Sequence, residues 1–417
     1  MKVLFITQTF FPSYSGGTET YLLNVALELA NRGISSLILC TNSNEKDGLY
    51  SYKGIPVQNV GKELNLFKEV DSIITTGNYD IVHVHTMGGK INDFFMQSLN
   101  HSALPVFLTP HLAENFCLNG GKLKYKNKFD CNGRVDVVKC QTCISFLNKG
   151  LPFYFKNKFS QYILQHVIPD SISARIFSQY HFLAKNVKKR ILNLQHNKVH
   201  IIALSKWYEA VLKINNFKSV TLIPQGVNSL FLTRKKEQLK SNQYQWIFIG
   251  RLSPEKGIEE LINVFIHNSS KKDKLLLCVF HNEELNDFEK LIFKKIEPFK
   301  NIYIYNNTKP EKLSNYLLQS DCLVLASKVR EMAPLVIIEA IASGIPVLVS
   351  NFIGEDVEGQ EVGYKFDYCN NNDFTSKFNK IREATHKTNF PGLLNYSLFS
   401  FEEVTKHHIE LYKSSLK

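Results

Sequence analysis

The sequence predicts an α/β protein with two doubly wound domains, and three observations support this fold class. At 417 residues the chain is long for a single domain. Residues 2–40 read as a strand, a glycine-containing loop, a helix and a second strand, which is how a doubly wound sheet begins. A second α/β series starts with the apolar strand at residues 246–250, after a polar segment at 228–245 that is typical of a linker.

The charge balance favours an anionic partner. The chain has 50 Lys and Arg against 38 Asp and Glu, a formal net charge of +12. A phosphorylated substrate or an anionic membrane surface would complement this surplus. Basic and aromatic residues alternate in the predicted helix at 151–194, which suits either a membrane surface or a packed face with a solvated edge. We do not expect nucleic acid, since only this helix offers the required basic face with aromatics.

The sequence also bears on the compartment. It has no run of about 18 apolar residues that would span a membrane, and the apolar run at its N-terminus is too short for a signal peptide. We therefore expect the protein in the cytoplasm, where its eight cysteines would stay reduced.

Residues 327–350 are the most informative stretch and read as a loop, a helix, a turn and a strand. Proline is tolerated in the first turn of a helix, so we expect the helix to start near Pro334 and to end at Gly344. Glu331 then lies in the loop before the helix, and Glu339 lies in the second turn of the helix.

This stretch has the features of an anion site. The free amides of Leu335 and Val336 at the helix N-terminus would favour a phosphate, and the two carboxylates could accept hydrogen bonds from hydroxyl groups on either side of it. Arg251 and Lys256 follow the strand at 246–250 and would aim two cations at the same sheet edge. A nucleotide sugar has this distribution of phosphate and hydroxyls. The alternative is an ordinary βα unit with surface charges.

In the first domain, three residues follow strands and should gather at the carboxyl edge of its sheet. Gly16 and Gly17 would let a ligand approach the backbone closely, and His111 follows the strand at 106–109. His83 and His85 end the strand at 80–85 and are weaker candidates. The alternatives are a plain turn for the glycines and ordinary polar packing for the histidines.

A long loop at residues 112–148 contains half of the cysteines, and we expect it to lack regular secondary structure. Four thiolates suit tetrahedral Zn²⁺, and the C-x-x-C spacing within the loop is that of a zinc knuckle. The alternatives are unligated thiols or a redox pair. The predicted ligands are Cys117, Cys131, Cys140 and Cys143.

Taken together, these motifs resemble family 4 retaining glycosyltransferases, which have the GT-B architecture. The resemblance rests on motifs that occur in the family's order over residues 1 to about 350: Gly16-Gly17-Thr18-Glu19, 80–85, 109–111, 223–227, 250–257, and Glu331-x7-Glu339 with 342–346.

The resemblance implies two facing Rossmann-like domains. The N-terminal domain (1–228, with the cysteine loop at 112–148) would bind the acceptor, and the C-terminal domain (229–392) would bind the nucleotide sugar. Residues 393–417 would form a helix that crosses back to the first domain.

The resemblance also implies roles for individual residues. Arg251 and Lys256, with the amides of Leu335 and Val336 beyond Pro334, would hold the diphosphate. Glu339 would bind the ribose. The donor sugar would be contacted by Glu331, Met332, Ala333 and His111. Gly16 and Gly17 would approach the diphosphate.

The activity implied is transfer of a sugar with retention, without a catalytic metal and with at most a structural zinc. A UDP-sugar is favoured as the donor and GDP-mannose comes next. The acceptor would be a lipid-linked saccharide in envelope polysaccharide or O-antigen assembly. The enzyme would lie in the cytoplasm or against the inner face of the membrane. The alternatives are a donor hydrolase or phosphorylase, and a nucleotide-binding GT-B scaffold without transferase activity.

Overall fold

A computed structural model describes most of the chain. The described residues are 1–12, 16–42, 47–61, 66–99, 103–117, 124–125, 129–147, 169, 172, 180–196, 199–232, 243–280, 284–353, 357, 362–386, 390 and 399–417. The chain divides into two compact units, one formed by Met1–Pro224 with Val404–Lys417 and the other by Gln225–Glu403.

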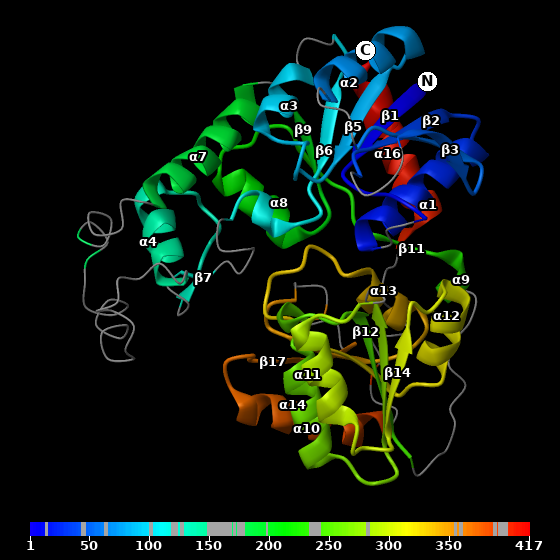
Figure 1. Ribbon diagram of the computed structural model, residues 1–417, viewed down its shortest axis with the longest axis vertical. Coiled ribbons are helices and arrows are strands. Elements are labelled where there is room, and N and C mark those ends of the chain that lie inside the picture. Colours follow the sequence, from blue (N-terminus) through cyan, green and yellow to red (C-terminus); the bar gives the residue numbers. More distant parts are fainter. Residues whose placement is uncertain are drawn as a thin grey trace. The chain divides into compact units, whose positions relative to one another are not determined.

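The first unit is built on an eight-stranded sheet in the order β10-β9-β6-β5-β1-β2-β4-β3 (Figure 1). All neighbouring strands are parallel except the β3–β4 hairpin. The strands are β1 (Lys2–Thr7), β2 (Ser35–Cys40), β3 (Gly48–Tyr52), β4 (Ile55–Asn59), β5 (Ile81–His85), β6 (Val106–Thr109), β9 (His200–Ala203) and β10 (Val220–Leu222).

The helices of this unit connect the parallel strands, as a doubly wound sheet requires. They are α1 (Gly17–Asn31), α2 (Leu66–Gly77), α3 (Asp93–Ser98), α4 (Val137–Leu147), α7 (His181–His196) and α8 (Lys206–Ile214), with a 3₁₀ turn η2 (Ala113–Asn115) and a short hairpin of β7 (Lys124–Tyr125) and β8 (Phe129–Asp130).

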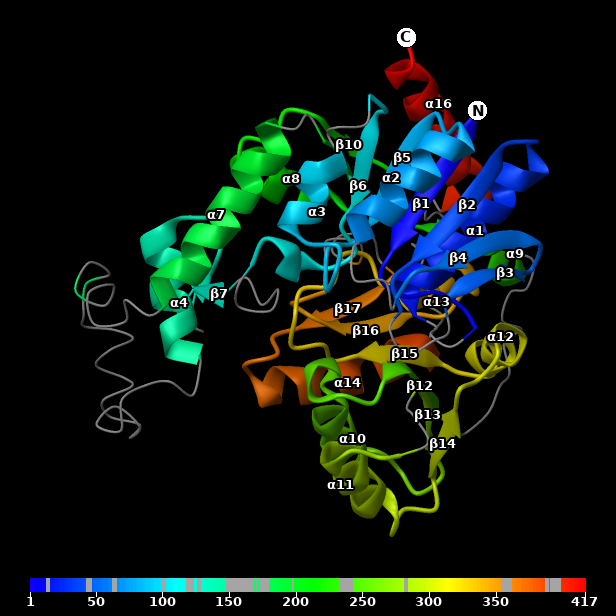
Figure 2. The same cartoon turned by 45° about the horizontal axis from the view of Figure 1, so that its top comes forward.

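The C-terminal helix α16 (Phe401–Ser415) packs on this first unit (Figure 2). The Tyr412 hydroxyl lies 2.6 Å from Nδ1 of His83 on β5, and Nε2 of His408 lies 2.7 Å from the hydroxyl of Tyr21 on α1. A capping box between Ser400 and Glu403 starts the helix, because each residue bonds the other's backbone N–H. The helix therefore starts at Phe401, within the predicted segment 393–417, of which residues 393–398 are not described.

The second unit has a fully parallel six-stranded sheet in the order β14-β13-β12-β15-β16-β17. Its elements are β11 (Gly226–Val227), α9 (Ser229–Leu232), β12 (Gln245–Arg251), η5 (Pro254–Lys256), α10 (Ile258–Asn268), β13 (Lys274–Phe280), α11 (Asp287–Ile296), β14 (Ile302–Asn306), α12 (Pro310–Leu318), β15 (Cys322–Leu325), α13 (Leu335–Ala342), β16 (Val347–Ser350), β17 (Gly363–Phe366), α14 (Asn371–His386) and β18 (Phe399–Ser400).

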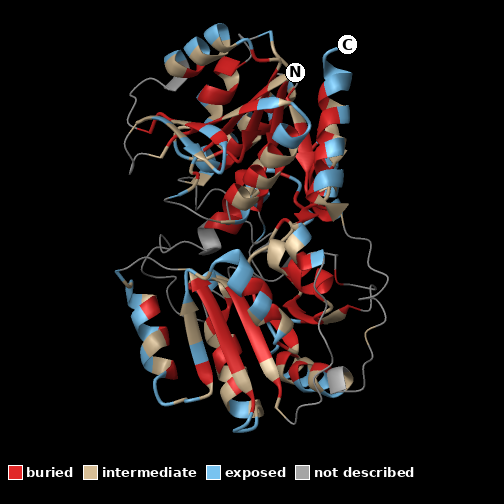
Figure 3. Ribbon diagram, turned by 90° about the vertical axis from the view of Figure 1, so that its right-hand side faces the viewer, coloured by how far each residue is buried: buried red, intermediate tan, exposed pale blue. Residues whose placement is uncertain are grey.

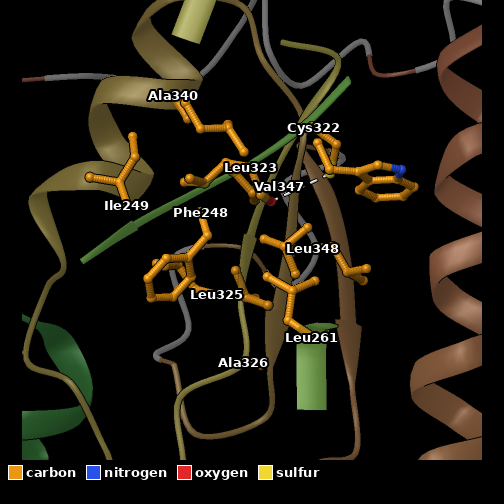
Figure 4. Close-up of a cluster of buried hydrophobic side chains, with 14 of the residues drawn as sticks. Phe248, Ile249, Leu261, Cys322, Leu323, Leu325, Ala326, Ala340, Val347 and Leu348 are labelled. Carbon is orange, nitrogen blue, oxygen red and sulfur yellow. Dashed lines mark hydrogen bonds between the residues drawn. The ribbon is translucent and has the colours of Figure 1, made fainter. Parts of the chain in front are cut away.

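The central strands of this sheet are buried on both faces, so they read as continuous apolar runs rather than alternating ones (Figure 3). Phe248 and Ile249 of β12 pack with Leu323 of β15, and Leu348 of β16 and Ala340 of α13 belong to the same core (Figure 4). This core fixes where β12 and β15 end, and both loops that follow them contain predicted site residues.

The cysteine segment differs from the expected loop without regular structure. Residues Val137–Leu147 form helix α4, which carries the C-x-x-C pair. The carboxylate of Asp136 accepts a hydrogen bond from the Lys139 amide at 2.9 Å, so it caps the helix start. The sequence prediction missed this cap. The predicted helix at 151–194 lies mostly outside the described residues, apart from α7.

Gly257 is a residue on which the second unit depends. Its φ is +64°, and a Cβ at this position would lie 1.9 Å from the carbonyl oxygen of Ala326. Gly344 also has a positive φ of +75°, but a Cβ there would meet nothing within 4 Å.

We expect Gly257→Ala to destabilise the second unit by at least about 2 kcal/mol, because it adds a steric clash to the cost of a left-handed residue. Gly344→Ala is the matched control and should cost only about 1 kcal/mol. The measurement is chemical denaturation followed by Trp246 fluorescence in a Trp207→Phe background. Equal losses in the two variants would contradict the expected clash.

Candidate active site

The predicted cations of the second unit follow the end of β12, at the carboxyl edge of the sheet. Arg251 is the last residue of this strand and is exposed. Its guanidinium has no hydrogen bond or ion pair with the residues that the structure describes, so it is available to an anion. Lys256 ends the 3₁₀ turn η5, five residues later.

Lys256 and Glu331 are brought together from separate loops. Nζ of Lys256 lies 2.8 Å from Oε2 of Glu331, and both side chains are largely buried. The hydroxyl of Ser327 donates a short hydrogen bond to the other carboxylate oxygen. Glu331 thus has a fixed position between a cation and a hydroxyl group.

Helix α13 begins just beyond this ion pair, as the sequence predicted. Pro334 is its N-cap, and the first hydrogen bond donated back to it comes from the Ile337 amide at 3.1 Å. The amides of Leu335 and Val336 donate no hydrogen bond to any described residue. Two free N–H groups at the positive end of a helix form a suitable site for a phosphate. Met332 is buried and Ala333 is partly exposed in the preceding loop.

Glu339 lies one turn into α13 and is 8% exposed. Burial raises the pKa of its carboxyl group from 4.5 to about 7. Its carboxylate has no hydrogen-bond partner among the described residues. A buried carboxylate without a partner is costly, and hydroxyl donors from a ligand would relieve that cost.

The sequence prediction missed an ionic cluster beside this site. Nζ of Lys328, which follows Ser327, lies 2.6 Å from a carboxylate oxygen of Glu260 on α10, and the Tyr368 hydroxyl donates to the same oxygen at 3.0 Å. The Lys328 amide also bonds the Glu255 carbonyl at 2.7 Å. These contacts join the loops after β12 and β15, and no local sequence pattern pairs residues this far apart.

In the first unit, His111 and the paired glycines lie at the carboxyl edge of the sheet. Gly16 is the N-cap of α1 and Gly17 is its first residue. The ring of Tyr21, one turn further along α1, lies 5.3 Å from the ring of His111. His111, which follows β6, is therefore close to the start of α1, which follows β1, although β5 lies between these two strands in the sheet.

His111 belongs to a buried cluster of four histidines. The other members are His83 and His85 of β5 and His408 of α16, each with 0% exposure. Burial lowers the pKa of His111 and of His408 to about 3, and it lowers the pKa values of His83 and His85 well below 6.5. All four rings are neutral at physiological pH. The sequence analysis ranked His83 and His85 low, because the helix that completes the cluster comes more than 300 residues later.

The four predicted zinc ligands, Cys117, Cys131, Cys140 and Cys143, form no disulfide among the described residues, and the first, second and fourth of them act electrostatically on Cys140. Burial, opposed by a backbone hydrogen bond and reinforced by the charges of the other three cysteines, raises the pKa of Cys140 to about 12. The Gly133 amide donates to Sγ of Cys131 at 3.3 Å. Within the described residues, however, no group of three or more His, Cys, Asp or Glu side chains is arranged to hold a metal ion. The donor set fits zinc, but its present geometry does not.

A cavity of about 920 Å³ lies elsewhere, at the opposite edge of the second sheet. Lys271, Lys272, Lys274 and Lys300 contribute to its lining. The C-terminal end of α10 also meets it, and cations complement the negative end of a helix. We therefore do not assign this cavity to the reaction.

None of the described helices is both long and apolar enough to cross a lipid bilayer.

Comparison with known proteins finds a family whose model matches most of the second unit. Residues 231–388 match the family described as Glycosyl transferases group 1. The Escherichia coli UDP-Gal:alpha-D-GlcNAc-diphosphoundecaprenol alpha-1,3-galactosyltransferase is 27% identical over 198 residues. That match spans 46% of this chain and only 50% of the relative.

Solved structures resemble the whole chain. Sucrose-phosphate synthase from Thermosynechococcus elongatus aligns over 99% of this chain and 98% of its own, with a TM-score of 0.68 and 16% identity. Anabaena HepE in complex with UDP aligns over 99% of this chain and 100% of its own, with a TM-score of 0.65 and 16% identity. At such low identity these alignments establish the fold alone. The chain therefore has the GT-B fold of two Rossmann-like domains, and its residues 231–388 match the Glycosyl transferases group 1 family.

Proposed function

We propose that this chain is a retaining glycosyltransferase that moves a sugar from a nucleotide sugar to a saccharide acceptor. The observation that carries the proposal is the Lys256–Glu331 ion pair. Lys256 lies in the loop that follows Arg251 at the end of β12, and Glu331 lies three residues before Pro334, the N-cap of α13. These groups come from two loops and together can bind one diphosphate and the sugar attached to it.

The diphosphate is bound by Arg251, Lys256 and the amides of Leu335 and Val336. Negative charge grows on it as the glycosidic bond stretches, and fixed cations and N–H dipoles stabilise that charge in the transition state. Glu331 and the backbone at Met332 and Ala333 hold the donor sugar. In this scheme no divalent metal is required for catalysis.

Glu339 accepts hydrogen bonds from the ribose hydroxyls. In the first domain, His111 contacts the donor sugar, and Gly16 and Gly17 approach the diphosphate. The leaving phosphate takes the proton of the acceptor hydroxyl on the face that the nucleotide leaves, so the configuration is retained and no protein nucleophile is needed. We assign residues 1–228 to the acceptor and 229–392 to the donor, with the helix within 393–417 completing the first domain.

We infer that the donor is a UDP-sugar, with GDP-mannose next, and that the acceptor is a lipid-linked saccharide of envelope polysaccharide or O-antigen assembly. The support is the name of the Escherichia coli relative, which uses UDP-Gal and a diphosphoundecaprenol acceptor, and the UDP complex of HepE. Such an acceptor would bring the enzyme from the cytoplasm to the inner face of the membrane, where its net charge of +12 suits anionic lipids.

A thermal-shift screen against UDP-, GDP- and ADP-sugars tests the donor, since a nucleotide that binds the folded state raises the unfolding midpoint. With the donor found, Arg251→Ala and Glu331→Ala should each lower kcat for transfer by about 100-fold or more. Lys271→Ala removes a cation at the opposite sheet edge and is the matched control. Normal turnover in either site variant would contradict the proposal, and sugar release without acceptor would indicate a hydrolase.

The raised pKa of Glu339 gives a pH test. Because its pKa is about 7 in the folded protein, against an ordinary value of 4.5, the folded state binds more protons between these pH values. Stability should therefore fall as pH rises from about 5 to 8, by up to about 3 kcal/mol. Glu339→Gln should remove this loss, as measured by denaturation midpoints at each pH. A variant with the same pH profile as the native protein would contradict the assignment.

We also propose that the four cysteines hold one structural zinc ion after a local rearrangement of their side chains. A zinc ion would turn the thiols into thiolates and close its coordination sphere, leaving no position for substrate. Elemental analysis should find about one zinc per chain, and the double variant Cys140→Ser/Cys143→Ser should lose it. Cys369→Ser, which changes an exposed cysteine outside the cluster, should keep it. If protein purified without chelators contained no zinc, this proposal would be wrong.

A further inference from the structure

Two consecutive residues at the end of β5 hold His111. Nδ1 of His85 lies 3.0 Å from Nε2 of His111, and the backbone N–H of His111 donates to Oγ1 of Thr86 at 3.0 Å. Thr86 has a φ of +67°, which is rare for a β-branched residue and persists only where the surroundings fix it. Both the ring and the backbone of His111 are thus fixed by the same turn.

The hydrogen bond between the two rings has a preferred direction. A neutral imidazole carries one N–H and one lone pair. Nε2 of His85 is buried and has no hydrogen-bond partner in the described part of the chain. Either tautomer of His85 leaves Nε2 unpaired, as an N–H donor or as a lone-pair acceptor, and a buried N–H group without a partner is the rarer of the two in folded proteins. The hydrogen of His85 therefore belongs on Nδ1, where it is donated to Nε2 of His111.

This direction determines the tautomer of His111. Because its Nε2 accepts the hydrogen bond, its own hydrogen lies on Nδ1. His111 is partly exposed. Its Nδ1 forms no hydrogen bond with a described residue and is not fully buried. Burial lowers the pKa of His111 to about 3, so the ring is neutral and offers an N–H group.

The neighbouring His83 has a different role. Its Nδ1 lies 2.6 Å from the Tyr412 hydroxyl and its Nε2 lies 2.7 Å from Oγ1 of Thr109, so both nitrogens bind structural partners. His85 has the same burial and the same strand, yet the only described partner of its ring nitrogens is His111. Structural contacts account for both ring nitrogens of His83. The single polar contact of His85 is with His111, so it orients the His111 ring.

We propose that His85 is a positioning residue for glycosyl transfer, holding His111 as the Nδ1–H tautomer so that His111 donates a hydrogen bond to a hydroxyl oxygen of the bound sugar. His111 keeps its proton throughout and does not act as a general base. The proposal rests on the proposed function, in which His111 contacts the donor sugar.

The test compares variants at two positions of β5 in the full-length protein. His85→Leu removes the donor, whereas His85→Asn keeps an amide N–H near the place of Nδ1. His83→Asn is the control for loss of a buried histidine on the same strand. Long-range ¹H–¹⁵N spectra of ¹⁵N-histidine-labelled protein, with His111→Asn used for assignment, report which ring nitrogen of His111 is protonated. Nucleotide release from UDP-galactose with an N-acetylglucosamine acceptor reports kcat.

We expect native His111 to be protonated at Nδ1 and His85→Leu to mix the tautomers and lower kcat by about 10- to 100-fold, with UDP affinity unchanged. His85→Asn should restore the tautomer and most of the rate. His83→Asn should lower the thermal midpoint and leave kcat within about twofold.

An Nε2–H tautomer in the native protein would overturn the proposal, as would full activity of His85→Leu or an equal loss of kcat in His83→Asn. If the native protein released no nucleotide from any nucleotide sugar, the proposed function would fail together with the positioning role. The spectra would still decide the tautomer by themselves.

Discussion

The approach of Gly257 to the carbonyl group of Ala326 is the constraint on which the candidate site of the second unit depends. It lets the loop after β12 pass directly against the end of β15, where any side chain would clash with backbone. The loops then share their charged groups, through the ion pair of Lys256 with Glu331 and that of Lys328 with Glu260. A cation, a carboxylate and a free helix end are thereby held together before any ligand binds, so their reorganisation cost in the reaction is small.

The first unit packs four histidines into one cluster, in which His83, His85 and His408 are fully buried and His111 is partly exposed. Desolvation keeps the rings neutral, so the cluster works through hydrogen bonds and not through charge. Two of the contacts come from α16, at the far end of the sequence, which ties the C-terminus to the sheet. Strand β5 thus carries a structural histidine, His83, and a second histidine, His85, whose partner is His111.

Most of the parallel strands could be predicted from sequence, because buried parallel strands are short apolar runs bounded by Gly, Pro and polar residues. The half-exposed strands β3, β4 and β17 were missed. β6 has the predicted bounds, Val106–Thr109. The start of α13 at Pro334 and its end before Gly344 were also readable, since both residues limit the backbone directly. Helix α4 was missed because cysteine spacing suggested a metal loop, and the Asp136 cap was overlooked.

The sequence by itself determined the fold class, the strands and the residue types at each strand end, because these follow from local backbone preferences and from hydrophobic periodicity. Only the tertiary structure decided which of those residues meet. The Lys256–Glu331 pair spans 75 residues, and the His83–Tyr412 contact spans 329. Contacts between loops of different strands depend on sheet order and on close packing, and the order of strands in a sheet is not written in any local segment.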